Sequence, residues 1–154
     1  MKRVLLLPAL LACASTAPSS APSTTKSAPN AAERCFSDAA VTPERKADEP
    51  ETVTVKHILV KHKDADPGAT RARGEACLRA RAALDELRKG ADFDELVTKY
   101  SDEAGAASRA GMVGKVQRSE VEPPFADAAF ALDVSQVSNV VETKHGFHVI
   151  LRTE

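Results

Sequence analysis

The hydrophobic pattern of this 154-residue chain changes abruptly at Thr52. Residues 14–32 are almost all Ala, Ser, Thr and Pro, and the chain remains charged and proline-bearing up to position 51. Such stretches bury too little apolar surface to offset the conformational entropy that folding removes. We therefore expect a disordered linker over residues 13–51 and a folded domain over residues 52–154. A domain of about 100 residues can bury a core, which must be mostly aliphatic because aromatic residues are only 4% of the chain.

Residues 1–12 have the parts of a secretory signal peptide. Residues 1–3 are basic, and the apolar run over residues 4–11 is too short to span a bilayer as a stable helix. The sequence Leu-Leu-Ala-Cys at residues 10–13 resembles a bacterial lipobox, in which cleavage leaves Cys13 to carry the lipids. Diacylation and N-acylation of this cysteine would supply more than the two chains that stable anchoring needs. The alternative is an ordinary signal peptide with an incidental cysteine.

The folded domain opens with a strand followed by two helices. β-branched and aliphatic residues alternate over residues 52–60, which predicts a strand with Val53, Val55 and His57 on one face. Apolar residues at helical spacing predict a helix over residues 71–89, and a second helix begins at Asp92, a good capping residue. The remaining predicted elements are a strand over 112–117, a helix over 123–132, and strands at 140–141 and 148–152. The order β-α-α-β-α-β-β indicates an α+β domain.

Four segments of this domain together resemble the parvulin family of rotamases. They occur in family order over about residues 53–153: Lys56–His62, Tyr100–Gly114, Glu122–Leu132 and Val140–Leu151. The resemblance implies the parvulin (FKBP-like) fold, a four-stranded, mostly antiparallel sheet surrounded by about four helices, here with a disordered N-terminal tether. The strands and helices read from the hydrophobic pattern agree with this fold.

The resemblance implies peptidyl-prolyl cis/trans isomerase activity on proline-containing polypeptides. An X-Pro bond favours trans by only about 0.5–1 kcal/mol, yet its isomers are separated by a barrier of about 18–20 kcal/mol. Catalysis therefore needs a site that holds the ring and favours the twisted amide, without breaking a bond. We expect neither a metal nor an organic cofactor.

The resemblance also implies an apolar slot for proline, lined by Phe125 and Val121 with Val113 beside them. Phe125 would supply a flat apolar wall for the pyrrolidine ring. Val121 is shorter than the methionine often found at its position, which favours a shallower slot. The alternative is that Phe125 is simply a core aromatic on a short helix.

His57 and His148 match the paired histidines of the family. The resemblance implies that their imidazoles meet beneath the substrate and hydrogen-bond, with Thr143 joining the network. Buried polar groups need such partners, so their role is largely architectural: they fix each other's tautomers and shape the floor of the slot. A satisfied pair of core histidines would look much the same.

Glu103 stands where parvulins place a Cys or Asp near the rotating bond. A carboxylate there is compatible with the idea that negative charge disfavours the planar form of the amide. The alternatives are a solvated loop charge, or a substitute role for the neighbouring Asp102. Met112 replaces the Asp usually found before the final apolar-Gly pair of this loop, so the loop departs from the family pattern.

The loop after the first strand bears on substrate choice. Phosphate-selecting parvulins carry a basic cluster there, because Arg and Lys pair with phosphate. This chain has Lys61 and Lys63, but Asp64 and Asp66 follow and the Arg pair is missing. Two carboxylates repel a phosphate, so we predict no requirement for phosphorylated serine or threonine.

With Cys13 acylated, Cys35 and Cys77 remain. An oxidising compartment permits a disulfide between them, and the alternative is two unrelated thiols with Cys77 packed as a small hydrophobe.

Two other functions compete with the isomerase reading of the sequence. A non-catalytic chaperone or peptide-binding module of parvulin fold is the main alternative. Metal binding is disfavoured, because His57 and His62 are expected on opposite faces of a strand. His145 and His148 lack ligand partners at characteristic spacing.

The charge and the N-terminal signal bear on partners and location. The formal net charge is −1, so no basic excess indicates nucleic acid, and we expect no nucleic-acid partner. We expect a monomer that is lipid-anchored in the bacterial cell envelope and faces the periplasm. Asp after the lipidated cysteine favours inner-membrane retention, and Ala14 lacks that signal, which favours the outer membrane.

Overall fold

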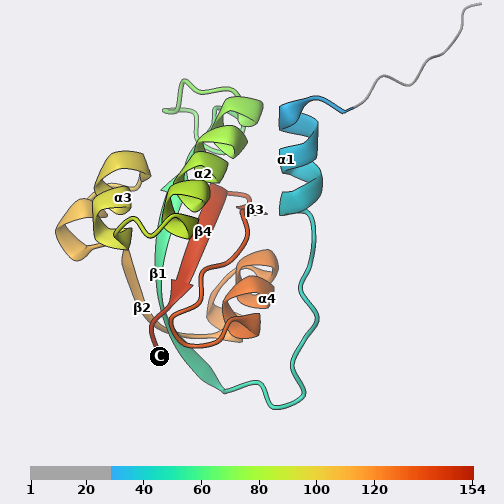
Figure 1. Cartoon of the computed structure of the whole chain (residues 1–154), viewed down its shortest axis with the longest axis vertical. Coiled ribbons are helices and arrows are strands. Elements are labelled where there is room, and N and C mark those ends of the chain that lie inside the picture. Colours follow the sequence, from blue (N-terminus) through green and yellow to red (C-terminus); the bar gives the residue numbers. More distant parts are fainter. Residues whose placement is uncertain (1–28) are drawn as a thin grey trace, which may run out of the picture.

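The computed structural model describes residues 29–154 (Figure 1). The predicted signal peptide and the lipidated Cys13 lie outside the described residues. Four strands form one sheet in the order β2-β1-β4-β3, and every neighbouring pair is antiparallel. The strands are β1 (Thr52–Val60), β2 (Met112–Gln117), β3 (Val141–Thr143) and β4 (Gly146–Arg152). The predicted fold class is confirmed, with the sheet wholly rather than mostly antiparallel.

Four α-helices and two short 3-10 turns surround the sheet. They are α1 (Ala31–Ala39), α2 (Arg73–Arg88), α3 (Phe93–Tyr100), α4 (Pro123–Ala131), η1 (Ala107–Arg109) and η2 (Arg118–Glu120). The Asp92 side chain accepts the backbone N–H groups of Asp94 and Glu95, so it caps α3 as the sequence predicts. Proline occupies the first turn of α4, where its missing N–H costs nothing.

Strand alternation divides the core into two layers. On one face of the sheet, Ile58 and Val60 of β1 pack with α2 and α3 in the larger apolar cluster. On the other face, Val53 and Val55 pack with α4 in a second cluster. Because successive side chains of a strand point to opposite faces, His57 lies on the same face as Val53 and Val55. Helix α4 therefore covers the face of the sheet that carries this histidine.

The structure departs from the predicted disordered linker at residues 31–39, which form helix α1. Asn30 and Glu33 cap its first turn reciprocally. Cys35 is buried and bonded to Cys77 of α2 in a disulfide, which answers the question left open for these two cysteines. The prediction of disorder is wrong at these residues, because one short helix carries too few apolar residues to indicate a fold. The stability of α1 comes from its contacts with α2.

Two further contacts fasten the N-terminal segment to the domain. The ring of Phe36 on α1 stacks on Phe147 of β4, with centroids 6.1 Å apart. After α1 the chain runs down one side of the molecule to β1 (Figure 1), and Glu49 pairs with Arg118 on the way. The folded unit thus includes residues that precede the predicted boundary at residue 52.

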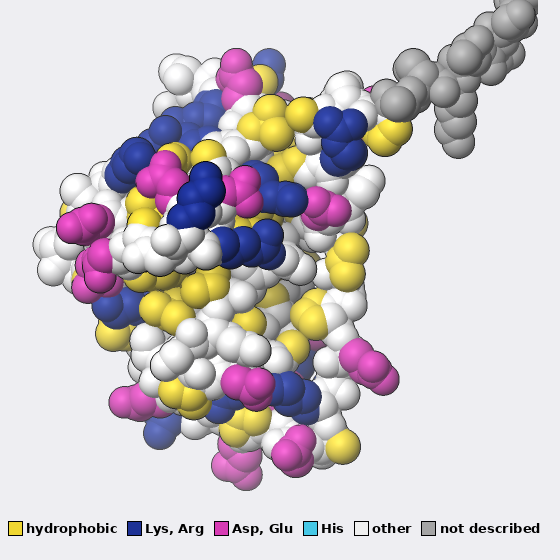
Figure 2. Space-filling model, viewed as in Figure 1, with side chains coloured by type: hydrophobic (Ala, Val, Ile, Leu, Met, Phe, Trp, Pro, Cys, Tyr) yellow, Lys and Arg dark blue, Asp and Glu magenta, His cyan; other side chains and the backbone are white. Residues whose placement is uncertain are grey.

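Charges of both signs alternate over the face that α2 presents (Figure 2). Two of the basic side chains of α2 have an acidic partner: Arg73 contacts Glu142, and Arg81 contacts Asp38, each at 2.6 Å. Within residues 29–154, no helix is both long and apolar enough to cross a membrane.

Candidate active site

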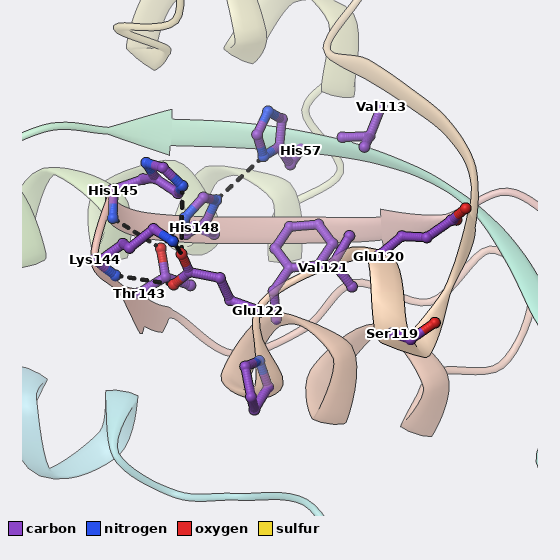
Figure 3. Close-up of a pocket in the computed structure, with 12 residues that line it drawn as sticks. His57, Val113, Ser119, Glu120, Val121, Glu122, Thr143, Lys144, His145 and His148 are labelled. Carbon is purple, nitrogen blue, oxygen red and sulfur yellow. Dashed lines mark hydrogen bonds and ion pairs between the residues drawn. The ribbon is translucent and has the colours of Figure 1, made fainter.

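A pocket of about 500 Å³ opens on the α4 side of the sheet (Figure 3). It lies between η2, the start of α4, the beginning of β2 and the turn that joins β3 to β4. Six of the predicted site residues line it: His57, Val113, Val121, Phe125, Thr143 and His148. The fold thus brings together residues that are up to 91 positions apart in the chain.

Strand register explains how the polar floor of this pocket forms. Strands β1 and β4 pair so that His57 faces Ile150 and Leu59 faces His148. The two histidines are therefore diagonal neighbours on one face of the sheet, within reach of each other. The register of β1 against β2 shifts between Val55 and Lys56, and such an irregularity re-aims side chains. Val113 lies at this shift and reaches the pocket.

Phe125 forms the apolar wall. Its ring stands nearly perpendicular to both imidazoles, at centroid distances of 5.9 Å from His57 and 5.4 Å from His148. Edge-to-face contacts of this kind are favourable for aromatic rings. Phe125 also belongs to the apolar cluster beneath α4, so it is both a core residue and a lining residue of the pocket.

A chain of hydrogen bonds runs through the floor. The Nδ1 atoms of His57 and His148 lie 3.1 Å apart, His148 Nε2 lies 2.8 Å from Thr143 Oγ1, and the backbone N–H of His145 donates to that oxygen. At the other end, His57 Nε2 lies 2.9 Å from Glu103 Oε2. An ionised carboxylate only accepts, so His57 carries a proton on Nε2.

When both imidazoles are neutral, the positions of the remaining protons follow from the proton on His57 Nε2. With its proton on Nε2, His57 accepts at Nδ1, so His148 donates from its own Nδ1. His148 Nε2 then accepts the hydroxyl proton of Thr143, whose oxygen accepts the His145 N–H. Burial, with smaller contributions from the neighbouring His57 and His145, lowers the pKa of His148 to about 3. His148 is therefore neutral at ordinary pH, as this chain of donors requires.

Glu103 is not among the residues that line the pocket; it contacts His57 from the loop between α3 and β2. Its carboxylate also contacts Arg109. Burial acts to raise the pKa of Glu103, but the His57 hydrogen bond and the nearby Arg109 hold that pKa below its ordinary value. Asp102 faces elsewhere: it accepts from the Lys61 N–H and from Arg71. Glu103, not Asp102, is thus the carboxylate that reaches the histidine pair.

Sequence reasoning missed the charged rim of the pocket. Glu122 precedes α4, and Lys144 and His145 form the β3–β4 turn across from it (Figure 3). Lys144 Nζ lies 2.6 Å and His145 Nε2 lies 3.4 Å from Glu122 Oε1. Burial acts to raise the pKa of Glu122, but Lys144 holds it below its ordinary value. The only signal in the sequence was the place of these residues inside two family-like segments.

Ser119, Glu120 and Pro123 also line the pocket without having been predicted. Among residues 29–154, no group of three or more His, Cys, Asp or Glu side chains is placed to hold a metal ion.

Comparisons with known proteins match this sequence and fold. Residues 57–154 match the family described as "Rotamase: PPIC-type PPIASE domain". The putative peptidyl-prolyl cis-trans isomerase dodo of Drosophila melanogaster is 38% identical over 113 residues, covering 68% of each chain. The structure of the peptidyl-prolyl isomerase ESS1 from Candida albicans aligns with a TM-score of 0.61 and 30% identity, over 73% of this chain and 67% of that one.

A bacterial structure is also similar. It comes from a pair of SurA-like chaperones of Campylobacter jejuni, the virulence factor PEB4 and the periplasmic protein Cj1289, with a TM-score of 0.54 and 31% identity. The match covers 69% of this chain but only 39% of that one.

The four-stranded antiparallel sheet with its surrounding helices is the fold that this chain shares with these relatives. The chain belongs to the PPIC-type rotamase family, and it is a peptidyl-prolyl cis-trans isomerase.

Proposed function

We propose that the pocket holds the proline ring of a polypeptide against Phe125, Val121 and Val113. The single observation that carries this proposal is the Phe125 ring, which stands perpendicular to the two imidazoles and leaves an apolar slot above a polar floor. A pyrrolidine ring is apolar and compact, so it gains from burial against such a wall.

In this mechanism the floor contributes shape and fixed dipoles rather than proton transfer. His57, His148 and Thr143 use their ring and hydroxyl groups on one another and on Glu103. Rotation about the C–N bond removes amide resonance, so a site that fits the twisted amide better than either planar isomer lowers the barrier. Because no bond is made or broken, no nucleophile is needed. Glu103 acts on this floor through His57.

Replacement of Phe125 tests the slot. We expect Phe125→Leu to lower kcat/KM on an Ala-Pro tetrapeptide by about tenfold, because a branched alkyl group covers the ring less completely. Phe130→Leu is the matched control: it lies on the same helix and in the same cluster but not in the pocket. Equal losses in both variants would contradict the slot. No acceleration by the wild type would leave the non-catalytic peptide-binding alternative.

The ion pairs of the loop after β1 support a substrate that needs no phosphate. Lys61 is paired with Asp66 at 2.8 Å, and Arg71 is paired with Asp102 at 2.6 Å. The Lys61 hydrogen bond lowers the pKa of Asp66, so that carboxylate stays charged beside the loop. Cations already matched by carboxylates attract a phosphate weakly.

The kcat/KM values for phosphorylated and unphosphorylated peptides test whether the enzyme needs a phosphate. We expect kcat/KM for Ser-Pro, Glu-Pro and phosphoserine-Pro versions of one peptide to agree within about threefold, because the loop offers no unpaired basic cluster to bind the phosphate. A preference of tenfold or more for the phosphorylated peptide would contradict the proposal. Lys63→Ala serves as the control for residual attraction by the loop.

We further propose that the protein acts on exported chains while anchored to the cell envelope through Cys13, with the outer membrane favoured. The Cys35–Cys77 disulfide supports an oxidising compartment, and the Campylobacter relatives include a protein described as periplasmic. Fractionation of cells that express the wild type or Cys13→Ser tests the anchor. The substitution should move the protein from the membrane to the soluble fraction, and mass spectrometry should find acyl chains on the wild type alone.

A further inference from the structure

Arg109 has no part in the predicted site, yet it contacts Glu103, the carboxylate that lies against His57. It ends η1, in the loop that carries Glu103. Its guanidinium uses all three of its nitrogens on this loop: Nη2 contacts Glu103 Oε2, Nη1 donates to Ala104 O at 3.1 Å, and Nε donates to Met112 O at 3.1 Å. The planar fork of arginine suits three acceptors at fixed angles, which a lysine ammonium cannot match.

The two ends of this loop are fixed to β1, one at Leu59 and the other at His57. Asp102 N–H donates to Leu59 O at 2.7 Å, and His57 N–H donates to Gly111 O at 2.8 Å. Between these anchors, Arg109 joins the carbonyl next to Glu103 to the carbonyl of Met112 at the start of β2. Arg109 therefore links the two ends of the loop. Its Nη2 contacts the same Glu103 oxygen that lies near His57 Nε2.

We propose that Arg109 is a positioning residue for the isomerase site, holding the Glu103 carboxylate against His57 Nε2 and so fixing the orientation and tautomer of that imidazole. This inference rests on the proposed role of His57 in the pocket floor. Within residues 29–154, the charged or titratable groups that contact Glu103 are His57 from β1 and Arg109 from η1. Arg109 is thus the single fixed positive charge at that carboxylate.

Imidazole ¹⁵N NMR reads the position of the proton without requiring turnover. In the wild type, His57 should show a protonated Nε2 and an accepting Nδ1. In Arg109→Met the His57 signals should move toward a mixture of tautomers, and in Arg109→Lys they should lie between the two. Arg88→Met removes an equal charge from an exposed site that contacts Asn139, and it should leave the signals unchanged.

The pH profile of kcat/KM gives the second readout. Loss of the Arg109 charge should move the acid limb to higher pH by about one unit, because an opposite charge at this distance lowers a carboxyl pKa by at least that much. In a Glu103→Gln background, Arg109→Met should cause no further shift, since no carboxylate remains to titrate. Arg88→Met should keep the wild-type profile.

The outcomes separate this inference from the proposed function. Unchanged His57 signals in both Arg109 variants would overturn it, whatever the activity. A coincident pH profile for Arg109→Met and the wild type would also overturn it. A wild type that fails to isomerise any peptide would sink the mechanism proposed for the pocket, while the NMR comparison would still decide the role of Arg109.

Discussion

His148 lies at the centre of the pocket floor, where one ring nitrogen meets His57 and the other meets Thr143. The imidazole is buried, and burial is the main reason that its pKa falls to about 3. A histidine usually titrates near pH 6.5. The folded protein therefore keeps this residue neutral through the range where the unfolded chain protonates it.

This difference predicts how stability depends on pH. Below about pH 6.5 the unfolded state binds a proton at His148 that the folded state does not, so stability falls as pH drops toward 3. The contribution of this group to the slope is about 1.4 kcal/mol per pH unit. Urea denaturation between pH 4 and 7 should give a shallower slope for His148→Gln than for the wild type. Parallel curves would rule out this linkage.

At the scale of elements, the loop between α3 and β2 is pressed against β1 at Gly111. This glycine has a φ of +69°, and a Cβ atom there would lie 2.5 Å from His57 O and 2.7 Å from a methyl group of Val97. Both a positive φ and the absence of a side chain are therefore required. The close approach is what places the loop and its Glu103 beside the histidine.

Gly111→Ala should consequently lower both stability and kcat/KM, since the loop must move away from β1. Gly90→Ala is the matched control, because Gly90 also has a positive φ, +93°, but open space around it. That control should cost about 1 kcal/mol of stability from backbone strain and leave activity intact. Thermal unfolding and the peptide assay measure the two effects, and equal activity in the two variants would argue against the close approach.

Helix α1 is held to α2 by the Cys35–Cys77 disulfide, which links residues 42 positions apart. Closing a loop of that length should contribute roughly 4 kcal/mol if the cross-link acts by restricting the unfolded chain. Reductant should lower the free energy of unfolding by about this amount. A Cys35→Ala, Cys77→Ala double variant should start from the lower value and be insensitive to reductant. A wild type unaffected by reductant would mean that the bond contributes nothing.

At the scale of the whole molecule, the N-terminal segment and the pocket lie on opposite faces of the sheet. The larger cluster holds Cys35, Ala39 and the buried side of α2, whereas the pocket lies on the α4 side. The N-terminal segment should therefore matter more for folding than for turnover.

A chain that begins at residue 52, with Cys77→Ala to remove the free thiol, separates the two contributions. We expect it to lose roughly 4 kcal/mol or more of stability, because the disulfide and the α1 contacts are both gone. Its kcat/KM, measured well below its melting temperature, should stay near the full-length value. A large loss of activity in a folded truncation would show that α1 supports the pocket.

The sequence by itself determined the strands, the three helices of the domain and their order, because alternation and helical spacing are local signals. The family-like segments also singled out Phe125, His57 and His148, which the fold then brought to one pocket. These residues could be found because their neighbours in the chain carry the resemblance.

Only the tertiary structure decided the contacts between segments that carry no such signal. The sequence left the pairing of Cys35 open and assigned α1 to a tether, since the apolar partners of that helix lie far along the chain. It likewise left the partners of Glu103 open, and the structure places that carboxylate against His57 and Arg109. A side chain's neighbours depend on distances set by the packed elements, and no local pattern contains those distances.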